Sequence, residues 1–455
     1  MQILSEARAT IALALPIIGT QLAQMAIHTT DVLLLARYSE ASLGGAALGM
    51  ALFYILWVMA LGLSMATPAI AAQALGRSGG RDADDRQGVR HAVHDGLILT
   101  GLFGLIAMGI LWASGPIFRL AGQPPDLIEI ATPFLQTLSF SMIPTLWFVV
   151  LRSFMAALER PRAAMLLMVL AIALNAGVNY VLVFGGQFWG LGIPALGAVG
   201  AGIGSSAVNT VILIALGWLL GRDAQFHSYR LLQGWWRSNA VRLKAYLRIG
   251  APIAFTLGAE VGLFSIAAML MGRLGAAEVA AHQLALQLAS IAFMVPMGLS
   301  QAATVRVGLA AGADDAAAVA RAGWVAVVLS LAFACCSALL LWQFSGYAIA
   351  LFLPDRSGPV FGLAVGYLAW AALFQLVDGT QATANGALRG LKDTAMPMLM
   401  ACFGYWIVGL GVAIWFGFFT PMRGNGIWLG LASGLAVVAL LLVWRFQYCL
   451  RKLEA

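Results

Sequence analysis

Residues 16–37 read PIIGTQLAQMAIHTTDVLLLAR, and residues 252–273 read PIAFTLGAEVGLFSIAAMLMGR. Each stretch is apolar enough and long enough for a helix that crosses a bilayer, which needs about 20 apolar residues. The two stretches open an alignment of residues 16–76 with residues 252–312 that needs no gap and in which 16 of 61 positions are identical. The chain is therefore predicted to consist of two related halves, each beginning with a membrane-spanning helix.

The composition of the whole chain is that of a protein dissolved in lipid. Of the 455 residues, 61% are hydrophobic and 10% are charged, whereas soluble domains have about 25% charged residues. Such a chain cannot cover a water-facing surface with polar groups, which excludes a soluble enzyme, a nucleic-acid-binding domain and a disordered protein. The formal charge of +7 is therefore attributed to basic residues at the membrane edges rather than to a nucleic-acid partner.

Apolar runs separated by charged or Gly/Pro-rich breaks predict an all-α membrane protein with twelve spans. The predicted spans are 10–36, 43–74, 93–115, 131–157, 163–184, 193–220, 248–272, 279–310, 318–345, 360–388, 395–419 and 425–448. With the N-terminus inside, 21 of the 26 Lys and Arg residues fall in inside segments and 5 in outside loops. Because cytoplasmic loops carry the excess of Lys and Arg, both termini are predicted to be cytoplasmic.

The longest hydrophilic stretch divides the chain near its middle. It predicts a six-helix bundle at 1–220, a cytoplasmic linker at 221–247 and a second six-helix bundle at 248–455. Since six is even, both bundles begin on the same side, so their pseudo-twofold axis should run along the membrane normal. Two bundles that face each other across a cleft can open it to either side in turn, which favours a carrier.

Three acidic residues, Asp31, Glu260 and Asp378, lie well inside apolar spans. An ionised carboxylate at the bilayer centre costs about 2.5–3.5 kcal/mol on insertion scales, so such residues usually mark ion or substrate pathways. Under the alignment of the halves Asp31 falls opposite Ala267 and Glu260 falls opposite Gln24. The acids break the internal symmetry, so the shared scaffold alone does not require them.

Polar residues at helical spacing accompany the acids, so each polar stripe should face the bundle interior or a wet cavity. The stripes are Thr20, Gln24, His28 and Asp31; Asn175 and Asn179; Thr256 and Glu260; Gln283 and Gln287; and Gln375, Asp378, Gln381 and Asn385. A low dielectric favours the neutral carboxyl group, which can exchange protons, and carboxylate with amide oxygens also suits a hard cation such as Na⁺. A cationic substrate could pair with the same acids. Packing is the alternative role of any single acid, and of His28 and His282.

Several motifs along the chain carry a family resemblance. They are Ala14-Leu15-Pro16 with Thr30-Asp31; Leu174-Asn175 through Asn179-Tyr180 to Gly185; Gly250-Ala251-Pro252-Ile253 leading to Glu260; Ala280-Ala281-His282-Gln283; Met294-Val295-Pro296-Met297 with Val305-Arg306-Val307-Gly308; and Asp378-Gly379-Thr380-Gln381 leading to Arg389-Gly390. With these motifs the chain resembles the multidrug and toxic compound extrusion (MATE) family, in its bacterial NorM-type branch, over essentially its whole length.

The resemblance implies a V-shaped twelve-helix exporter that expels organic cations and other xenobiotics in exchange for Na⁺ or H⁺. Asp31 with Asn175 and Asn179 resembles the cation or proton site of the family's N-terminal half. Glu260 and Asp378 resemble the acids that NorM-type members use in the C-terminal half, with Gln283 nearby. All three acids would be Na⁺ ligands in a sodium-coupled protein. The predicted substrate contacts are Gln24, His282, Gln283, Gln375 and Gln381.

The leading functional hypothesis is therefore antiport of cationic amphipathic compounds against a monovalent cation, by a monomer in the bacterial inner membrane. No cofactor other than the coupling ion is expected. The alternative is a flippase for a lipid-linked precursor, which would need a cationic cavity for pyrophosphate, whereas the buried charges here are negative. A membrane enzyme would need a nucleophile with its base or a metal cluster, and the sequence contains neither pattern.

Overall fold

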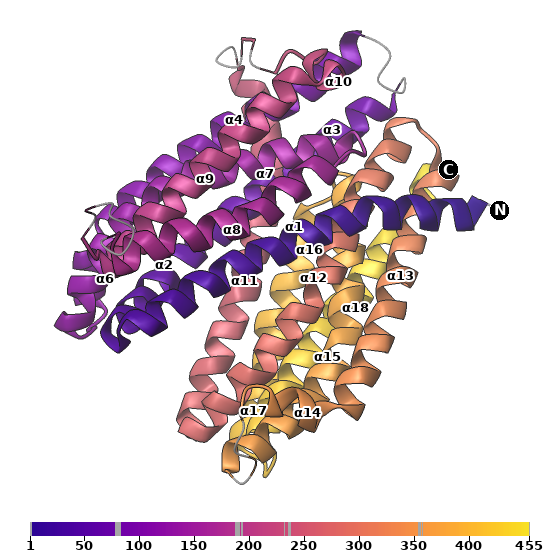
Figure 1. Ribbon diagram of the computed structural model, residues 1–455. Helices are drawn as coiled ribbons and strands as arrows, with labels where there is room; N and C mark the ends of the chain where they lie inside the picture. Colours follow the sequence, from indigo (N-terminus) through magenta and orange to yellow (C-terminus); the bar gives the residue numbers. More distant parts are fainter. Residues whose placement is uncertain are drawn as a thin grey trace. The chain divides into compact units, whose positions relative to one another are not determined.

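The computed structural model of the chain describes residues 2–77, 83–186, 192, 194–231, 233–234, 238–353, 356 and 358–454. Throughout these residues the secondary structure is helical (Figure 1). Lipid offers no partner for backbone N–H and C=O groups, so an apolar chain satisfies them within helices. The expectation of an all-α membrane protein is confirmed.

Twelve of the described segments are long and apolar enough to cross a membrane, as predicted. Nine of these spans are single helices. They are α1 (Gln2–Tyr38), α4 (Ala83–Trp112), α8 (Arg162–Phe184), α9 (Gly197–Arg222), α11 (Ala240–Leu274), α12 (Ala276–Gly312), α13 (Ala316–Gln343), α15 (Pro359–Gly390) and α18 (Gly424–Glu454). Short helices α5 (Ser114–Leu120), α10 (Ala224–His227) and α14 (Ser345–Ala350) lie between spans. The chain is therefore a multi-pass membrane protein.

The three remaining spans are interrupted helices. The second span consists of α2 (Glu40–Ser64) and α3 (Ala66–Gly76), and the fourth of α6 (Pro125–Leu138), the 3₁₀ turn η1 (Ser139–Ser141) and α7 (Met142–Ala157). The eleventh consists of α16 (Ala395–Cys402), the π-helix η3 (Phe403–Gly409) and α17 (Leu410–Phe418). Such short 3₁₀ and π segments inside longer helices often coincide with functional positions.

The contacts of the chain divide it into two compact units. One, called here the amino-terminal unit, consists of Gly19–Thr67 and Arg81–Ala254; the other, the carboxy-terminal unit, consists of Met1–Ile18, Pro68–Gly80 and Phe255–Ala455. The division passes through α1 and α11 and close to the break between α2 and α3. The bundle limits at 220 and 248 remain predictions about the sequence halves.

Each unit has its own apolar core. The core of the carboxy-terminal unit is centred on large, fully buried side chains that include Trp428, Tyr405 and Phe446. In the amino-terminal unit, residues of α2, α4, α6 and α9 surround Leu111, Leu135 and Met142. Each core is thus rigid enough to hold polar groups at fixed positions within its own unit.

The predicted linker at 221–247 is partly bound to the amino-terminal unit, although residues 232 and 235–237 lie outside the described part. Phe226 and Tyr229 are buried against Phe154, with ring centroids 5.8 and 5.3 Å away. Asp95 of α4 accepts a hydrogen bond of 2.5 Å from Ser238. In the first turn of α11, Arg242 Nε lies 3.6 Å from Asp95 Oδ2. The beginning of α11 therefore packs with the amino-terminal unit, which the sequence pattern alone did not indicate.

Candidate cation site and cavity

Asp31 lies in a cluster of polar side chains inside the amino-terminal unit. Asn179 Nδ2 donates to Asp31 Oδ1 at 2.5 Å, and Ser205 Oγ donates to Asp31 Oδ2 at 3.0 Å. The Nδ2 atoms of Asn175 and Asn179 lie 3.5 and 3.2 Å from Ser205 Oγ. Three helices, α1, α8 and α9, thus bring together one carboxylate, two amides and a hydroxyl, and the predicted site residues Asp31, Asn175 and Asn179 are among them.

The two amides carry oxygens that the protein does not use. Asn175 and Asn179 are fully buried, and within the described part of the chain neither Oδ1 atom receives a hydrogen bond. A buried acceptor without a partner costs about 1–3 kcal/mol. With the Asp31 carboxylate these oxygens form a donor set that fits a hard monovalent cation.

Local sequence explains why α8 and α9 approach so closely. Asn175 and Asn179 are four residues apart and therefore lie on one face of α8. Opposite them, α9 carries glycine at 200, 202 and 204. A Cβ atom at Gly204 would overlap Oδ1 of Asn179, and one at Gly200 would overlap the backbone of Leu182. Glycine is needed at both positions because the helices touch there.

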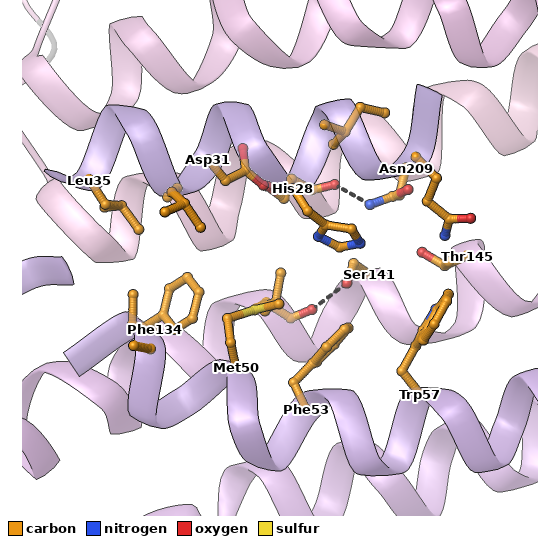
Figure 2. Close-up of a pocket in the computed structure, with 18 of the residues that line it drawn as sticks. His28, Asp31, Leu35, Met50, Phe53, Trp57, Phe134, Ser141, Thr145 and Asn209 are labelled. Carbon is orange, nitrogen blue, oxygen red and sulfur yellow. Dashed lines mark hydrogen bonds between the residues drawn. The ribbon is translucent and has the colours of Figure 1, made fainter. Parts of the chain in front are cut away.

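A cavity of about 380 Å³ opens beside this cluster, entirely within the amino-terminal unit. Asp31 and Ser205 belong to both the cluster and the cavity wall. Figure 2 shows α1 contributing His28, Asp31 and Leu35, with Met50, Phe53 and Trp57 opposite. The remaining polar lining comes from Gln24, Ser141, Thr145 and Asn209, and the rest is apolar. The cavity is therefore an apolar, aromatic chamber with a carboxylate in its wall.

The other two acids lie in the carboxy-terminal unit. Asp378 is buried, Glu260 is half-buried, and their charges interact. Glu260 is also hydrogen-bonded to Tyr405 and interacts with the charge of Arg389. Tyr405 lies in the π-helix η3, and its hydroxyl accepts a 2.6 Å hydrogen bond from Gln381 Nε2. Within the described residues Asp378 Oδ1 has no hydrogen-bond partner. The unit thus contains a second acidic cluster.

The other predicted substrate contacts occupy different surroundings. Gln24 lines the large cavity. Gln375 accepts a 2.8 Å hydrogen bond from Ser337 and, with Asp378, lines a void of about 10 Å³. Gln283 is exposed, whereas His282 is fully buried, with its ring 5.4 Å from that of Trp428. Of the predicted substrate contacts, then, Gln24 alone lines the large cavity.

Sequence reasoning missed two members of these clusters, Ser205 and Tyr405. Ser205 follows a run of small residues and resembles ordinary helix packing until the contact with Asp31 is known. Tyr405 lies in an apolar stretch, and no residue pattern in the sequence predicts the π-helix that contains it. The regular polar stripes revealed the clusters, but single residues on a third helix could not be recognised.

Comparisons with known proteins agree with these observations. The MatE family profile matches residues 16–181 and 252–415. The chain is 42% identical to a probable multidrug resistance protein NorM of Mesorhizobium japonicum, covering 97% of this chain and 93% of that protein. It is 39% identical to the probable NorM of Brucella suis (97% and 92% covered) and 36% identical to the multidrug resistance protein NorM of Burkholderia vietnamiensis (96% and 93%).

Solved structures share the fold at lower sequence identity. An outward-facing multidrug resistance MATE family transporter of the MOP superfamily superimposes with a TM-score of 0.88 at 19% identity, covering 99% of this chain and 97% of that chain. A eukaryotic MATE transporter superimposes with a TM-score of 0.84 at 19% identity, covering 100% and 99%. The resemblance inferred from the sequence motifs is confirmed. The chain belongs to the MatE family of membrane transporters.

Proposed function

We propose that the protein is a multidrug efflux transporter that exchanges cationic amphipathic compounds for Na⁺ or H⁺ across the bacterial inner membrane. One observation carries the proposal: the carboxylate of Asp31 belongs both to an oxygen-rich cluster and to the wall of a cavity of about 380 Å³. A single negative charge is thereby offered to two kinds of cation. The names of the NorM relatives support the drug-efflux class.

The inorganic cation would bind on the cluster side of Asp31. Rotation of the Asn179 amide by half a turn exchanges its Nδ2 and Oδ1 atoms, so its oxygen instead of its N–H group faces the carboxylate. Asn175 Oδ1 and the hydroxyl oxygen of Ser205 complete a ligand set made of oxygen. A proton would instead bind directly to the Asp31 carboxyl group. Either ion neutralises Asp31.

The organic cation would bind on the cavity side. Phe53, Trp57, Phe134 and Phe148 supply aromatic surface, and Met50 and Met168 supply flexible, polarisable side chains. Aromatic faces attract organic cations, and methionines adapt to ligands of different shape. Because the wall contains few directional polar groups, such a chamber selects for charge and aromatic character rather than for one molecular outline.

Competition at Asp31 couples the two movements. While an inorganic cation neutralises the carboxylate, an organic cation in the cavity has no counter-charge, so it dissociates. When the inorganic cation leaves, the carboxylate again favours an organic cation from the cytoplasmic side. A ligand can shift a conformational equilibrium only if it binds the two conformations with different affinities. For both cations this difference in affinity would come from the contact with Asp31.

Glu260 and Asp378 would form a second cation-coupling site in the carboxy-terminal unit. The two acids interact with each other there, and Glu260 also interacts with the positive charge of Arg389. These carboxyl groups can be neutralised by a proton or by a bound coupling cation. Replacing Glu260 by Gln and Asp378 by Asn should therefore weaken the coupling of efflux to the ion gradient. Binding of the organic cation in the amino-terminal cavity should remain.

The flippase alternative is less well supported by the charge of the cavity. In a transporter of the same fold from Pyrococcus furiosus, with a TM-score of 0.87 at 19% identity, the reverse polarity of the binding pocket suggests a different function. In the cavity of this chain the charged side chain among the described lining residues at neutral pH is a carboxylate, which repels pyrophosphate.

The test is ethidium efflux from proteoliposomes under an imposed Na⁺ gradient and, separately, an imposed pH gradient. The wild type should respond to at least one gradient, and Asp31→Asn should lose the gradient-driven efflux while remaining folded. Asp126→Asn, an exposed acid at the start of α6, is the matched control. Full gradient-driven efflux by Asp31→Asn, or selective binding of lipid-linked phosphates in place of ethidium, would overturn the proposal.

A further inference from the structure

His28 is the side chain nearest in sequence to Asp31 that also faces the cavity. It precedes Asp31 by three residues on α1, and its ring points into the cavity (Figure 2). The side chain is exposed although it lies on a membrane-spanning helix, so water in the cavity can reach it. Within the described part of the chain, neither ring nitrogen has a hydrogen-bond partner in the protein.

The cavity contains few other groups that can change charge. Helix α1 contributes Asp31 and His28; the lining residues of α2, α6, η1, α7, α8 and α9 are apolar side chains, hydroxyls and the amide of Asn209. Imidazole is the side chain whose ordinary titration falls between pH 5 and 8. Of the described lining residues, therefore, Asp31 and His28 alone have side chains that can gain or lose a charge by binding a proton.

We propose that His28 is a second proton-accepting residue of this cavity and that its protonation helps to expel a cationic substrate. The inference rests on the proposed function, because it needs the cavity to be the substrate site. It adds a residue that neither the oxygen cluster at Asp31 nor the acids of the carboxy-terminal unit contain.

The charge of the cavity explains the effect. With Asp31 ionised and His28 neutral, the cavity carries one negative charge and attracts an organic cation. Neutralising Asp31, by a proton or by Na⁺, removes the attraction. A proton taken from the aqueous phase by the His28 imidazole then gives the cavity one positive charge, and like charges in an apolar chamber repel. The net charge of the cavity thus changes by two units rather than by one.

Two consequences separate this role from simple packing. A single protonation can lower the affinity for a ligand by at most tenfold per pH unit. With two protonations, the affinity for cationic ligands should fall more steeply than this on acidification. Uncharged ligands of similar shape should not show the extra loss, because they have no charge to repel.

The experiment is equilibrium binding of radiolabelled tetraphenylphosphonium to the purified full-length protein between pH 5 and 8 in Na⁺-free buffer. Triphenylphosphine oxide is the uncharged probe. The variants are His28→Gln and His28→Asn, with His227→Gln, an exposed histidine of α10, as the control. We expect the wild type and His227→Gln to lose more than tenfold affinity for the cation per pH unit in part of this range. Both His28 variants should lose at most tenfold.

The outcomes are distinguishable from failure of the proposed function. If Asp31→Asn lowers cation binding at pH 8 but both His28 variants keep the wild-type pH profile, the role of His28 is wrong and the cavity assignment stands. The role of His28 is equally wrong if the uncharged probe shows the same extra loss as the cation. If Asp31→Asn binds the cation as tightly as the wild type, the cavity assignment itself fails. Binding of the uncharged probe by the His28 variants shows that they are folded.

Discussion

The proposed role of Asp31 in binding two cations depends on neighbours that leave oxygen atoms unused on one side of it and apolar surface on the other. The geometry depends on residues that are not themselves ligands. Gly204 is the clearest case, because α9 can approach Asn179 only without a side chain at that position.

Replacement of Gly204 by Ala should weaken cation binding without removing a ligand. The new methyl group would overlap Oδ1 of Asn179, so the amide must turn away from Asp31 or the helices must separate. Loss of a supporting contact at a metal site typically costs about 10–100-fold in affinity. Titration of Na⁺ or protons against tetraphenylphosphonium binding measures the change. Gly217→Ala on the same helix, where a Cβ meets open space, should behave as the wild type; equal affinities for the two variants would contradict the assigned role of Gly204.

The acidic cluster of the carboxy-terminal unit allows a separate test at Tyr405. Its hydroxyl is hydrogen-bonded to Gln381 and to Glu260. Tyr405→Phe removes both interactions but keeps the ring, so it should change the gradient dependence of efflux and leave drug binding in the amino-terminal cavity within about threefold. Phe264→Leu, in the apolar core of the same unit, is a control for general loosening. A Tyr405→Phe protein with wild-type gradient dependence would show that this hydroxyl has no part in coupling.

Single polar residues limit what the sequence could predict. Asp31, Asn175 and Asn179 were predicted to act together because the motifs that contain them resemble the cation or proton site in the amino-terminal half of the family. Their meeting with Ser205 depends on the packing of a third helix, which spacing along the chain does not specify. The placement of His282 against Trp428 also depends on packing, since a buried histidine and a site histidine look alike in sequence.

Helix α18 packs against η3 and α17 through a stripe of glycines. Gly426, Gly430 and Gly434 are spaced by four, and Cβ atoms there would overlap Phe416, Ala413 and Gly409 respectively. Small residues at this spacing allow membrane helices to approach closely, where van der Waals packing replaces the hydrophobic drive that lipid does not provide. The stripe therefore fixes the π-helix that carries Tyr405.

Replacement of Gly430 by Ala should destabilise the carboxy-terminal unit, because the methyl group would meet the backbone of Ala413, which cannot move aside without separating the helices. Overpacking of this kind typically costs about 1–3 kcal/mol. Thermal unfolding in detergent, followed by intrinsic tryptophan fluorescence, should show a lower midpoint. Gly411→Ala in α17 meets open space and should unfold like the wild type. An unchanged midpoint for Gly430→Ala would contradict the packing account.

The positions of the helices could be predicted from the sequence, but the interruptions within them could not. Apolar runs of bilayer length define the spans because lipid requires internally bonded backbone, and all twelve are present. The breaks between α2 and α3, at η1 and at η3 were not predicted. Each break changes a few backbone hydrogen bonds inside an apolar stretch. Because the residues on both sides are equally apolar, the composition of the stretch does not predict the break. Pro68 and Pro144 lie in the first turns of α3 and α7, just after two of these breaks.

The orientation of the molecule in the membrane is predicted from the distribution of its charges rather than from packing. Of its Lys and Arg residues, 21 lie in segments assigned to the cytoplasm and 5 in outside loops, and this asymmetry predicts cytoplasmic termini. Single cysteines introduced into a cysteine-free protein would report the orientation. Arg119→Cys in α5 should react with a membrane-impermeant maleimide in intact cells, and Lys452→Cys near the end of α18 should react only after permeabilisation. Both residues are exposed, so the reverse pattern would mean that the orientation is inverted.

The division into two units gives the molecule two separate acidic clusters, one with a large cavity and one without it among the described residues. The internal sequence repeat accounts for the matching first helices of the halves. It does not account for the cavity at Asp31, which arises from side chains that differ between the halves. Sequence comparison of the halves thus predicted the scaffold, and the asymmetric acids pointed to the function.

The central claim is that organic and inorganic cations compete for the Asp31 carboxylate, and equilibrium competition tests it most directly. Tetraphenylphosphonium binding to the purified protein is measured at increasing Na⁺ and, separately, at decreasing pH, for the wild type and Asp31→Asn. With at least one of the two ions, the apparent Kd of the wild type should rise in proportion to the ion's concentration at constant binding capacity. Asp31→Asn should bind at least about 30-fold more weakly, as expected when one partner of a buried charge pair is lost, and should be insensitive to that ion. A wild-type Kd that neither Na⁺ nor protons change, or an Asp31→Asn protein with wild-type affinity, would contradict the account.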